Sequence, residues 1–460
     1  MSRKLQTTFF LLAMAAVACG GANFAGASSE GSTASDALVM PPAPKPVAQG
    51  AYYTGDYRNM LAEFGLSKAE IQQRVEHDYQ QLFHGDAATQ TVMYQGPANE
   101  NGPSAYIKDI GSDDVRSEGM SYGMMFAVQL DKKSDFDALW NFAHTYMYHA
   151  DENHPDAGYF AWSMSEDGTV RDDNPAPDGE EYFAMSLLFA SNRWGDGDGI
   201  FNYGKAAKKI LSDMIHREDK TGEITQWDGE KKQTWKNNAT IVALMHPEYH
   251  MVRFSPNTQN FASNSDHTDP SYHVPAFYEL FALWGPKEDA EFWKTAAAVS
   301  RDYFVKVAHP ETGLTPDYAE FDGTPVAASW NPNTAHFGPD AYRTAMNWSV
   351  DCAWWGKDIK RQEELSSKLQ RFFQSKGVYA HQASYTLDGA QNLVDYQSMG
   401  LTAMNAAASI CSCEKVAFEF VEMLWRTPLK TGKWRYYDGM LTMFALLNLS
   451  GNYKIYKPAK

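Results

Sequence analysis

The sequence has few cysteines, no excess of positive charge and no long apolar run. Four cysteines in 460 residues are too few for a disulfide framework. The net charge of −17 argues against a nucleic-acid-binding surface, which needs clustered Lys and Arg, and against anionic membranes or polyanionic substrates. The apolar run over residues 8–18 is too short to span a bilayer. A neutral substrate fits this composition best.

The first fifty residues resemble an export signal followed by a tether. Arg3-Lys4 precedes the apolar run, and Ala16-Val17-Ala18 fits a cleavage site. The residues up to Cys19-Gly20 also resemble a bacterial lipobox, in which Cys19 carries a lipid anchor after cleavage. We expect a signal peptide or lipobox over 1–19 and a Ser/Ala/Gly/Pro-rich tether over 20–50. The protein is expected to be extracytoplasmic: periplasmic, anchored to the outer membrane, or secreted.

The remaining cysteines and the short acidic and histidine motifs predict no cofactor and no metal. For Cys352, Cys411 and Cys413 we favour free buried thiols. The alternative is one disulfide between Cys352 and either Cys411 or Cys413. Cys411-Ser-Cys413 lacks a second ligand pair at zinc spacing. The acidic stretch 194–199 lacks the closing Glu of a calcium loop, and 246–250 is not H-E-x-x-H.

Helical periodicity dominates the chain after residue 51. A capping box at Ser67–Glu70 opens the first helix, and no regular strands or second linker follow. We therefore predict one domain over 51–460 that is all-α, or nearly so, with long cleft-forming loops such as 162–179 and 310–340 and an inserted surface loop over 221–249. The predicted helices are 68–83, 120–130, 136–148, 181–193, 203–217, 275–284, 290–307, 341–355, 361–376, 400–410, 416–425 and 439–449.

Gly119-Met-Ser-Tyr-Gly123 fits the nucleophile elbow of serine hydrolases, G-x-S-x-G. An elbow needs an apolar strand before the serine, but residues 111–118 are polar and charged, and no βαβ pattern follows. Glu118 is therefore the better candidate than Ser121. It stands at a helix start with small neighbours that leave room for a ligand, although the helix dipole alone would also favour an acidic residue there.

Acidic residues recur at junctions between loops and helices. Glu118, Asp178, Asp269 and Asp340 each stand at such a junction beside aromatic residues. Taken singly, each fits an ordinary helix-start or capping residue. Glycoside hydrolysis, however, needs two carboxyl groups that flank one bond. The 63 aromatic residues (25 Phe, 25 Tyr and 13 Trp) are mostly core, but their surplus also suits a cleft in which sugar rings stack on Trp and Tyr.

Five segments, in order along the chain, resemble glycoside hydrolase family eight. They are Arg116-Ser-Glu118-Gly-Met-Ser-Tyr-Gly123, Pro175-Ala-Pro-Asp178-Gly-Glu-Glu-Tyr-Phe-Ala184, Asp269-Pro-Ser-Tyr-His273, Asp340-Ala-Tyr-Arg343, and Arg435-Tyr-Tyr-Asp438 with Ser450-Gly-Asn452. Together they cover essentially all of 51–460. Five long motifs in register are far more specific than the lone elbow pentamer.

The resemblance implies an (α/α)6 barrel of helical hairpins and an inverting hydrolase of β-1,4-linked glycans. Glu118 would be the acid that protonates the leaving oxygen, and Asp340 the base that activates water. Asp178 would hold the sugar at the cleavage point and help to keep Glu118 protonated. Tyr272 would position the attacking water, and Tyr122, Arg343 and Tyr396 would also contact the substrate.

Within the family, the segments 117–125, 192–198 and 277–281 are most similar to the xylan-active branch, and particularly to reducing-end xylose-releasing exo-oligoxylanases. The expected substrate is a xylooligosaccharide or xylan, and no protein partner is implied. One difference from the exo-acting members leaves endo action as an alternative. Exo-acting members carry Leu-His-Pro in the loop that closes the cleft, whereas this chain has Asp395-Tyr-Gln-Ser398 before Met399. We favour exo action over an endo-xylanase with an open cleft, and both over a non-catalytic glycan-binding lipoprotein.

Overall fold

A computed structural model describes residues 40–228, 231–259 and 267–459. The predicted signal or lipobox, including Cys19, and most of the predicted tether lie outside these residues. Helices alternate between two roles along the chain. Six form an inner set: α4 (Ser117–Gln129), α6 (Pro177–Trp194), α8 (Pro275–Trp284), α10 (Tyr342–Trp354), α12 (Met399–Ala407) and α14 (Arg435–Leu449). Six form an outer set: α3 (Lys68–His84), α5 (Lys133–Phe142), α7 (Tyr203–His216), α9 (Ala290–Val307), α11 (Ile359–Lys376) and α13 (Val416–Arg426).

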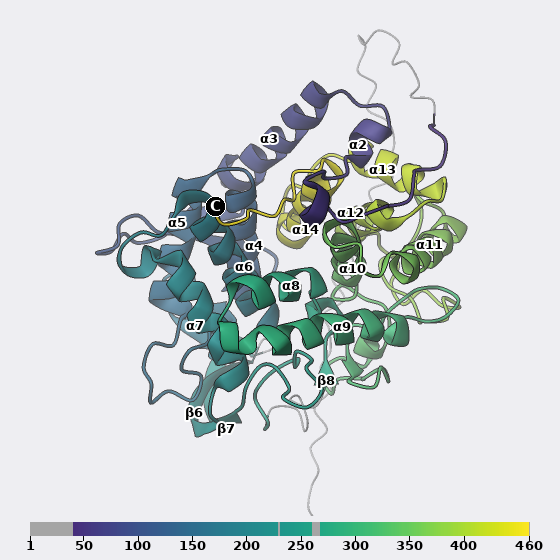
Figure 1. The fold of residues 1–460 in the computed structure, drawn as a ribbon. Coiled ribbons are helices and arrows are strands. Elements are labelled where there is room, and N and C mark those ends of the chain that lie inside the picture. The colour runs from purple at the N-terminus through teal and green to yellow at the C-terminus, as the bar shows by residue number, and fades with distance from the viewer. Residues whose placement is uncertain (1–39, 229–230, 260–266, 460) are drawn as a thin grey trace, which may run out of the picture.

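The inner helices close into a ring. Each contacts the next inner helix in chain order, and α14 returns to α4. Each outer helix packs against an inner partner, with α5 on α4, α7 on α6, α9 on α8, α11 on α10, α13 on α12 and α3 on α14. Figure 1 shows the outer helices around the inner ones. This arrangement is the predicted (α/α)6 barrel.

The inner and outer helices differ in how their apolar residues are distributed around the helix. Apolar or small residues cover every side of α4, and Glu118 is its one residue that is not buried. The outer α3 instead buries one stripe, which includes Ile71, Val75, Tyr79 and Leu82, and exposes the other side. A helix that is apolar all round belongs inside a core, whereas an amphipathic helix covers it. No helix among the described residues has both the length and the apolarity needed to cross a membrane.

Most predicted helices lie within a few residues of the observed ones, and 275–284 and 290–307 agree at both ends. The predicted helix 136–148 is two elements: α5 changes at its end into a π-helix, η1 (Ala143–Met147). Shorter elements complete the described part of the chain: α1 (Ala51–Thr54), α2 (Met60–Glu63), η2 (Gly199–Phe201), η4 (Pro270–Tyr272), η5 (Lys287–Asp289), η6 (Pro332–Ala335) and η7 (Ala408–Cys411).

The prediction that regular strands are absent was wrong. A five-stranded antiparallel sheet comprises β1 (Met93–Gln95), β2 (Ala105–Asp109), β3 (Asp114–Arg116), β4 (Ser163–Met164) and β5 (Val170–Asp172). These strands are too short to give a period-two signal. The predicted surface loop 221–249 consists mainly of a hairpin of β6 (Lys220–Asp228) and β7 (Gln233–Ile241). Much of the hairpin is exposed, so its sequence lacks apolar alternation. A final pair joins β8 (His267–Thr268) to β9 (Ala319–Glu320).

The preference for free thiols was also wrong for two of the three cysteines. Cys352 and Cys411 form a disulfide with a Cα–Cα distance of 6.0 Å, and Cys413 is free. The bridge joins α10 to η7, which pack together although 59 residues separate them in sequence. Sequence spacing carries no information on this contact, because it arises only when the ring of inner helices closes.

Candidate active site

The acidic junctions predicted from the sequence lie together at the end of the barrel where the inner helices begin. Glu118 and Asp178 are the second residues of α4 and α6. Asp269 caps η4 just before α8, and Asp340 lies two residues before α10. The short sheet fixes the first of these positions, since β3 runs directly into α4 and the Ser117 N–H donates to the Trp162 carbonyl. The N-terminal ends of helices stabilise negative charge, so this end of the barrel suits carboxylates.

One buried arginine, Arg343 on α10, connects the four carboxylates. Its Nη1 lies 2.8 Å from Glu118 Oε2 and 2.9 Å from Asp178 Oδ2. Its Nη2 lies 3.3 Å from Asp340 Oδ1 and 3.4 Å from Asp269 Oδ2. We call Arg343 and these four carboxylates the Arg343 cluster. Because one positive charge faces four acidic groups, they cannot all ionise without mutual repulsion.

Burial and this charge imbalance hold protons in the cluster. Burial raises the pKa of Glu118, although Arg343 opposes the shift. Burial also raises the pKa of Asp178 to about 7, again against Arg343, and the negative charge of Glu118 adds to the rise. The pKa of Asp269 rises well above its ordinary value, first through burial and then through Asp340. The cluster therefore keeps part of its carboxyl groups protonated near neutral pH, as a general acid requires.

Glu118 is held at both of its carboxylate oxygens. The Tyr436 hydroxyl of α14 donates to Oε1 at 2.7 Å, while Arg343 binds Oε2. Gly119 makes this contact feasible, since a Cβ there would come within 2.7 Å of the Tyr436 ring. The sequence placed Tyr436 within a family segment but gave it no role. Its contact with Glu118 spans 318 residues, which no local pattern reports.

Asp340 is the most exposed acidic member of the cluster, with a side chain 35 % exposed, against 15 % for Glu118. Asp317 positions the turn that carries it by accepting N–H bonds from Gly338 and Ala341. The Tyr437 hydroxyl donates to the Pro339 carbonyl of the same turn at 2.7 Å. Sequence reasoning missed Asp317, because nothing but its place in a long loop marks it. These bonds fix Asp340 while its carboxylate stays open to solvent.

The three tyrosines predicted to contact substrate differ in their environment. The Tyr122 hydroxyl accepts a bond from Arg343 at 3.0 Å and lies 3.4 Å from Asp178. The Tyr272 ring is buried, with the Arg343 guanidinium 5.7 Å from its centre. Tyr396 is 48 % exposed; its carbonyl accepts from the Ala383 N–H, and the Ala383 carbonyl accepts from the Tyr342 hydroxyl. Tyr122 and Tyr272 thus lie against Arg343 of the cluster, whereas Tyr396 is at the surface.

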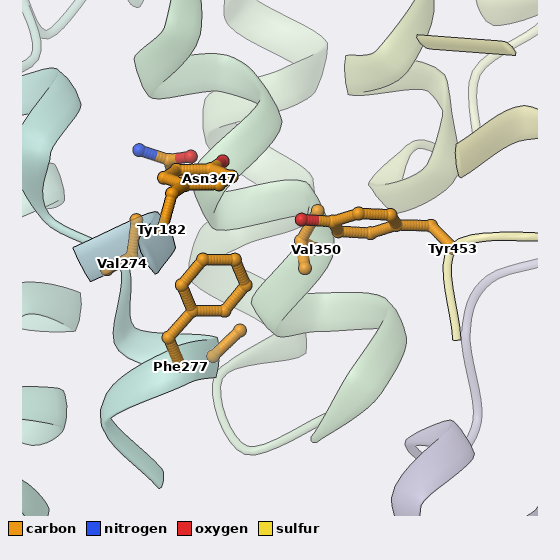
Figure 2. A pocket seen from close by; sticks show the side chains of 7 residues that line it. Tyr182, Val274, Phe277, Asn347, Val350 and Tyr453 are labelled. Atoms are coloured by element: carbon orange, nitrogen blue, oxygen red, sulfur yellow. The ribbon is translucent and has the colours of Figure 1, made fainter. Parts of the chain in front are cut away.

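Aromatic side chains close the barrel beneath the cluster. Tyr122 packs edge-on against Tyr182 and Phe444, and Tyr182 packs on Phe277. Figure 2 shows the small cavity that remains, lined by residues that include Tyr182, Phe277, Asn347 and Tyr453. Its volume is about 10 Å³, which is room for about one water. This cavity is therefore too small to admit a sugar to the cluster from beneath.

Ser121 does not have the setting of a nucleophile. It lies in the second turn of α4, fully buried, and its hydroxyl donates to the Glu118 carbonyl at 3.0 Å. A nucleophile elbow instead exposes its serine at a sharp turn between a strand and a helix. Ser121 therefore lacks the exposed turn position of a nucleophile elbow.

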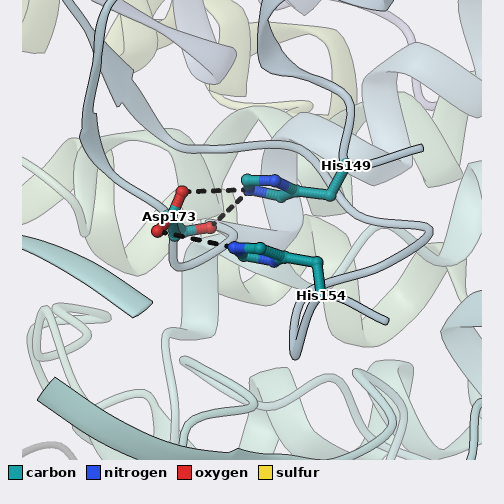
Figure 3. Close-up of side chains that lie close together, drawn as sticks. All are labelled: His149, His154 and Asp173. Atoms are coloured by element: carbon teal, nitrogen blue, oxygen red, sulfur yellow. Dashed lines mark hydrogen bonds and ion pairs between the residues drawn. The ribbon is translucent and has the colours of Figure 1, made fainter. Parts of the chain in front are cut away.

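Three residues outside the cluster bring potential metal-binding atoms together. Ligand atoms of His149, His154 and Asp173 lie within 4.8 Å of one another (Figure 3). The two imidazole rings, however, stack in parallel, 4.2 Å apart, so an ion in the plane of one ring lies outside the plane of the other. The Asp156 N–H also donates to His154 Nδ1. A neutral His154 ring therefore carries its proton on Nε2, the nitrogen that faces Asp173. This geometry favours hydrogen bonding over joint coordination of an ion.

A comparison with known protein families shows which family this chain belongs to. The model for "Glycosyl hydrolases family 8" matches residues 101–249 and 220–451, which together span most of the chain. The chain belongs to glycosyl hydrolase family 8. The predicted resemblance is confirmed, and the barrel is the one that the family's solved structures share.

Relatives of this family 8 protein cover nearly its whole described length. Rex8A of Paenibacillus barcinonensis, named a reducing-end xylose-releasing exo-oligoxylanase, is 43% identical over 409 residues, which are 89% of this chain and 99% of Rex8A. A family 8 structure from Teredinibacter turnerae, a xylobiose complex, is 51% identical with a TM-score of 0.83 and covers 89% of this chain and 100% of its own. A catalytic mutant of the xylanase from the same organism, in complex with xylohexaose, is 50% identical over the same shares, also with a TM-score of 0.83.

Proposed function

We propose that this protein hydrolyses β-1,4-xylosidic bonds in xylooligosaccharides with inversion of configuration and releases xylose from the reducing end. The observation that carries the proposal is the gathering of Glu118, Asp178 and Asp340 around Arg343 at the open end of the barrel. Relatives named for this activity, at 40–43% identity over most of the chain, support the choice of xylose.

In the proposed reaction Glu118 donates its proton to the glycosidic oxygen as the bond breaks. Burial raises the pKa of Glu118, which favours the protonated form that a general acid needs. Tyr436 and Arg343 fix the orientation of the carboxyl group. Because these two bonds already orient the carboxyl group, the reaction loses less entropy in reaching its transition state.

Asp340 is the proposed base, which takes a proton from the water that attacks the anomeric carbon. It is more exposed than Glu118 and binds the other terminal nitrogen of Arg343, so the two groups lie on different sides of the guanidinium. Inverting enzymes need such a gap between acid and base to hold the water. Tyr272 lies against the same guanidinium, and we propose that it positions that water. Asp178 and Tyr122 are the proposed contacts to the sugar ring.

A time course with xylohexaose tests the proposal. Single xylose units and xylopentaose should appear first, and proton NMR should show the new reducing end in the α configuration. A β product contradicts inversion. Activity on carboxymethylcellulose or chitosan in place of xylohexaose contradicts the choice of substrate.

A second candidate is an endo-xylanase with an open cleft. Two observations favour it: the chain is 50% identical to the xylanase of Teredinibacter turnerae, and Asp395–Ser398 replaces the Leu-His-Pro segment of exo-acting members. The exposed ring of Tyr396 is on this loop. In the same time course, xylobiose and xylotriose before any xylose would establish endo action.

We further propose that the protein is exported and carries a lipid on Cys19. The supporting feature is the sequence Ala16-Val17-Ala18-Cys19-Gly20 after a short apolar run. Metabolic labelling with a radioactive fatty acid should mark the full-length protein but not Cys19→Ser. Equal labelling of the two proteins contradicts the anchor.

A further inference from the structure

The flank of the barrel carries a cavity that the proposed reaction does not use. It has a volume of about 350 Å³, against about 10 Å³ for the cavity beneath the Arg343 cluster. It lies between the outer helices α5 and α7, with η1 and η2 at its edges. Because α5 and α7 pack on the outside of α4 and α6 (Figure 1), this flank pocket lies between two helices of the outer set. Its volume is within the range of small-molecule sites.

One wall of the flank pocket is a column of aromatic rings. Trp140, His144 and Tyr148 follow one another at four-residue spacing, and Phe160 lies behind them. The π-helix creates this column: the Tyr148 N–H donates to the carbonyl of Ala143, five residues earlier, and the wider turn stacks Tyr148 on His144 at 5.4 Å. π-helical turns are rare and occur frequently at functional sites. Trp140 Nε1 donates to the Ile200 carbonyl, which fixes the indole as the floor.

The polar groups of the pocket have unused hydrogen-bonding capacity. Within the described part of the chain, the Tyr148 hydroxyl, the His144 ring nitrogens and the Lys205 ammonium form no hydrogen bond or ion pair. Asn202 uses its oxygen to cap α7 through the Lys205 N–H, and its amide nitrogen has no partner there. Burial lowers the pKa of His144, so its ring is neutral near pH 7 and offers one donor and one acceptor.

These groups suit a neutral ligand with several hydroxyls. The inner donors and acceptors are a phenol, a neutral imidazole and an amide, none of which carries charge. Lys209 pairs with Asp213, and Lys205 is at the exposed edge, so an anion would meet little compensating charge inside. Aromatic walls with a few polar groups match a pyranose ring, which has apolar faces and a hydroxyl rim.

We propose that the flank pocket binds a xylose residue of a xylan chain at a second site, separate from the Arg343 cluster. The identity of this sugar rests on the proposed function, since an enzyme that acts on xylan meets this polymer at high local concentration. A second contact on one polymer raises the effective concentration of the chain at the cleft without a change in the reacting groups.

Calorimetric titration with xylotetraose tests the proposal in the full-length Glu118→Gln protein, in which turnover is suppressed. Ala206→Phe fills the pocket from its α7 wall, and Tyr148→Ala removes part of the aromatic column. Lys208→Ala, on the exposed side of the same helix, is the matched control. We expect one binding event to disappear, or to weaken at least ten-fold, in both pocket variants and to persist in the control.

The same number of xylotetraose molecules bound with the same affinities by the parent and by both pocket variants would overturn the proposal. If Ala206→Phe fails to fold, Asn202→Asp replaces it, because the carboxylate still caps α7 but lacks the amide N–H donors. This variant should weaken the same event several-fold, and unchanged binding would again contradict the site. Hydrolysis of xylohexaose by the wild-type protein tests the proposed function separately from the second binding site.

Discussion

Two groups of carboxylates precede or begin the inner helices of this barrel, and their hydrogen-bond partners differ. In the Arg343 cluster, Glu118 and Asp178 share one guanidinium. In the second group, which we call the hairpin anchor, Asp172 and Asp173 accept backbone N–H bonds from Trp227 and Thr225 of β6. His149 and His154 complete the anchor by stacking beside Asp173 (Figure 3).

The partners determine what each group can do. A carboxylate that accepts bonds from the backbone is favoured in its charged form and ties one segment to another. Although burial raises it, the pKa of Asp173 is lowered overall by bonds from His154 and Thr225. The pKa of Asp178 is raised to about 7, because burial outweighs Arg343. Asp173 thus uses its charge for structure, whereas the cluster holds protons that can move. The other carboxyl of the anchor, Asp172, differs from Asp173, because burial raises its pKa to about 6 despite the bonds that it accepts.

The largest expected effect comes from replacing one carboxylate in each group by its amide. Glu118→Gln removes the proposed proton donor and should lower kcat on xylohexaose by roughly 10²–10⁴-fold. Asp173→Asn should leave kcat within a few-fold, since it touches no proposed reacting group. Steady-state release of reducing sugar measures both. Similar losses in the two variants would remove the distinction between the groups.

Asp173→Asn should instead affect stability. It leaves the Thr225 N–H with a weaker acceptor and should lower the free energy of unfolding by about 1–3 kcal/mol at pH 7. Because the pKa of Asp173 is lowered in the folded state, its contribution is present above the unfolded pKa and is lost as the pH falls through the folded value. Urea unfolding at pH 7 and pH 3.5 measures the difference between variant and wild type, which should shrink in acid. Glu152→Gln, at an exposed residue on the neighbouring loop, is the control.

Local patterns predicted the helices, because each inner or outer helix has its own apolar pattern, as α4 and α3 show. They also placed Glu118, Asp178, Asp269 and Asp340 at helix starts, which became one site because every inner helix begins at the same end of the barrel. Tyr436, Asp317 and the Cys352–Cys411 bridge could not be predicted this way. Their contacts join segments far apart in the chain and depend on closure of the ring.

Asp178→Asn should change stability in the opposite direction from Asp173→Asn. The folded pKa of about 7 lies above the unfolded value, so the contribution of Asp178 is present below the unfolded pKa and is lost as the pH rises through about 7. At pH 8 a buried charge is removed, and the variant should be more stable by about 1 kcal/mol, while activity falls. Thermal unfolding at pH 8 and pH 4 tests this, with the gain confined to the higher pH. A loss of stability at pH 8 would mean that the cluster is also a structural ion pair.

The smallest expected effect distinguishes Tyr436 as a positioning residue from mere packing. Its hydroxyl donates to Glu118 Oε1 and lowers the pKa of that carboxyl, in opposition to the rise that burial causes. Tyr436→Phe keeps the ring and removes the bond, so Glu118 should retain its proton to higher pH. The alkaline limb of the kcat/KM profile on xylohexaose should therefore move upward, with a loss of about 1 kcal/mol in transition-state stabilisation at the optimum. Tyr437→Phe, which removes a hydroxyl bonded to the Pro339 carbonyl instead, should leave that limb in place. Equal limbs in wild type and Tyr436→Phe would show that the Tyr436 bond does not set the proton affinity of Glu118.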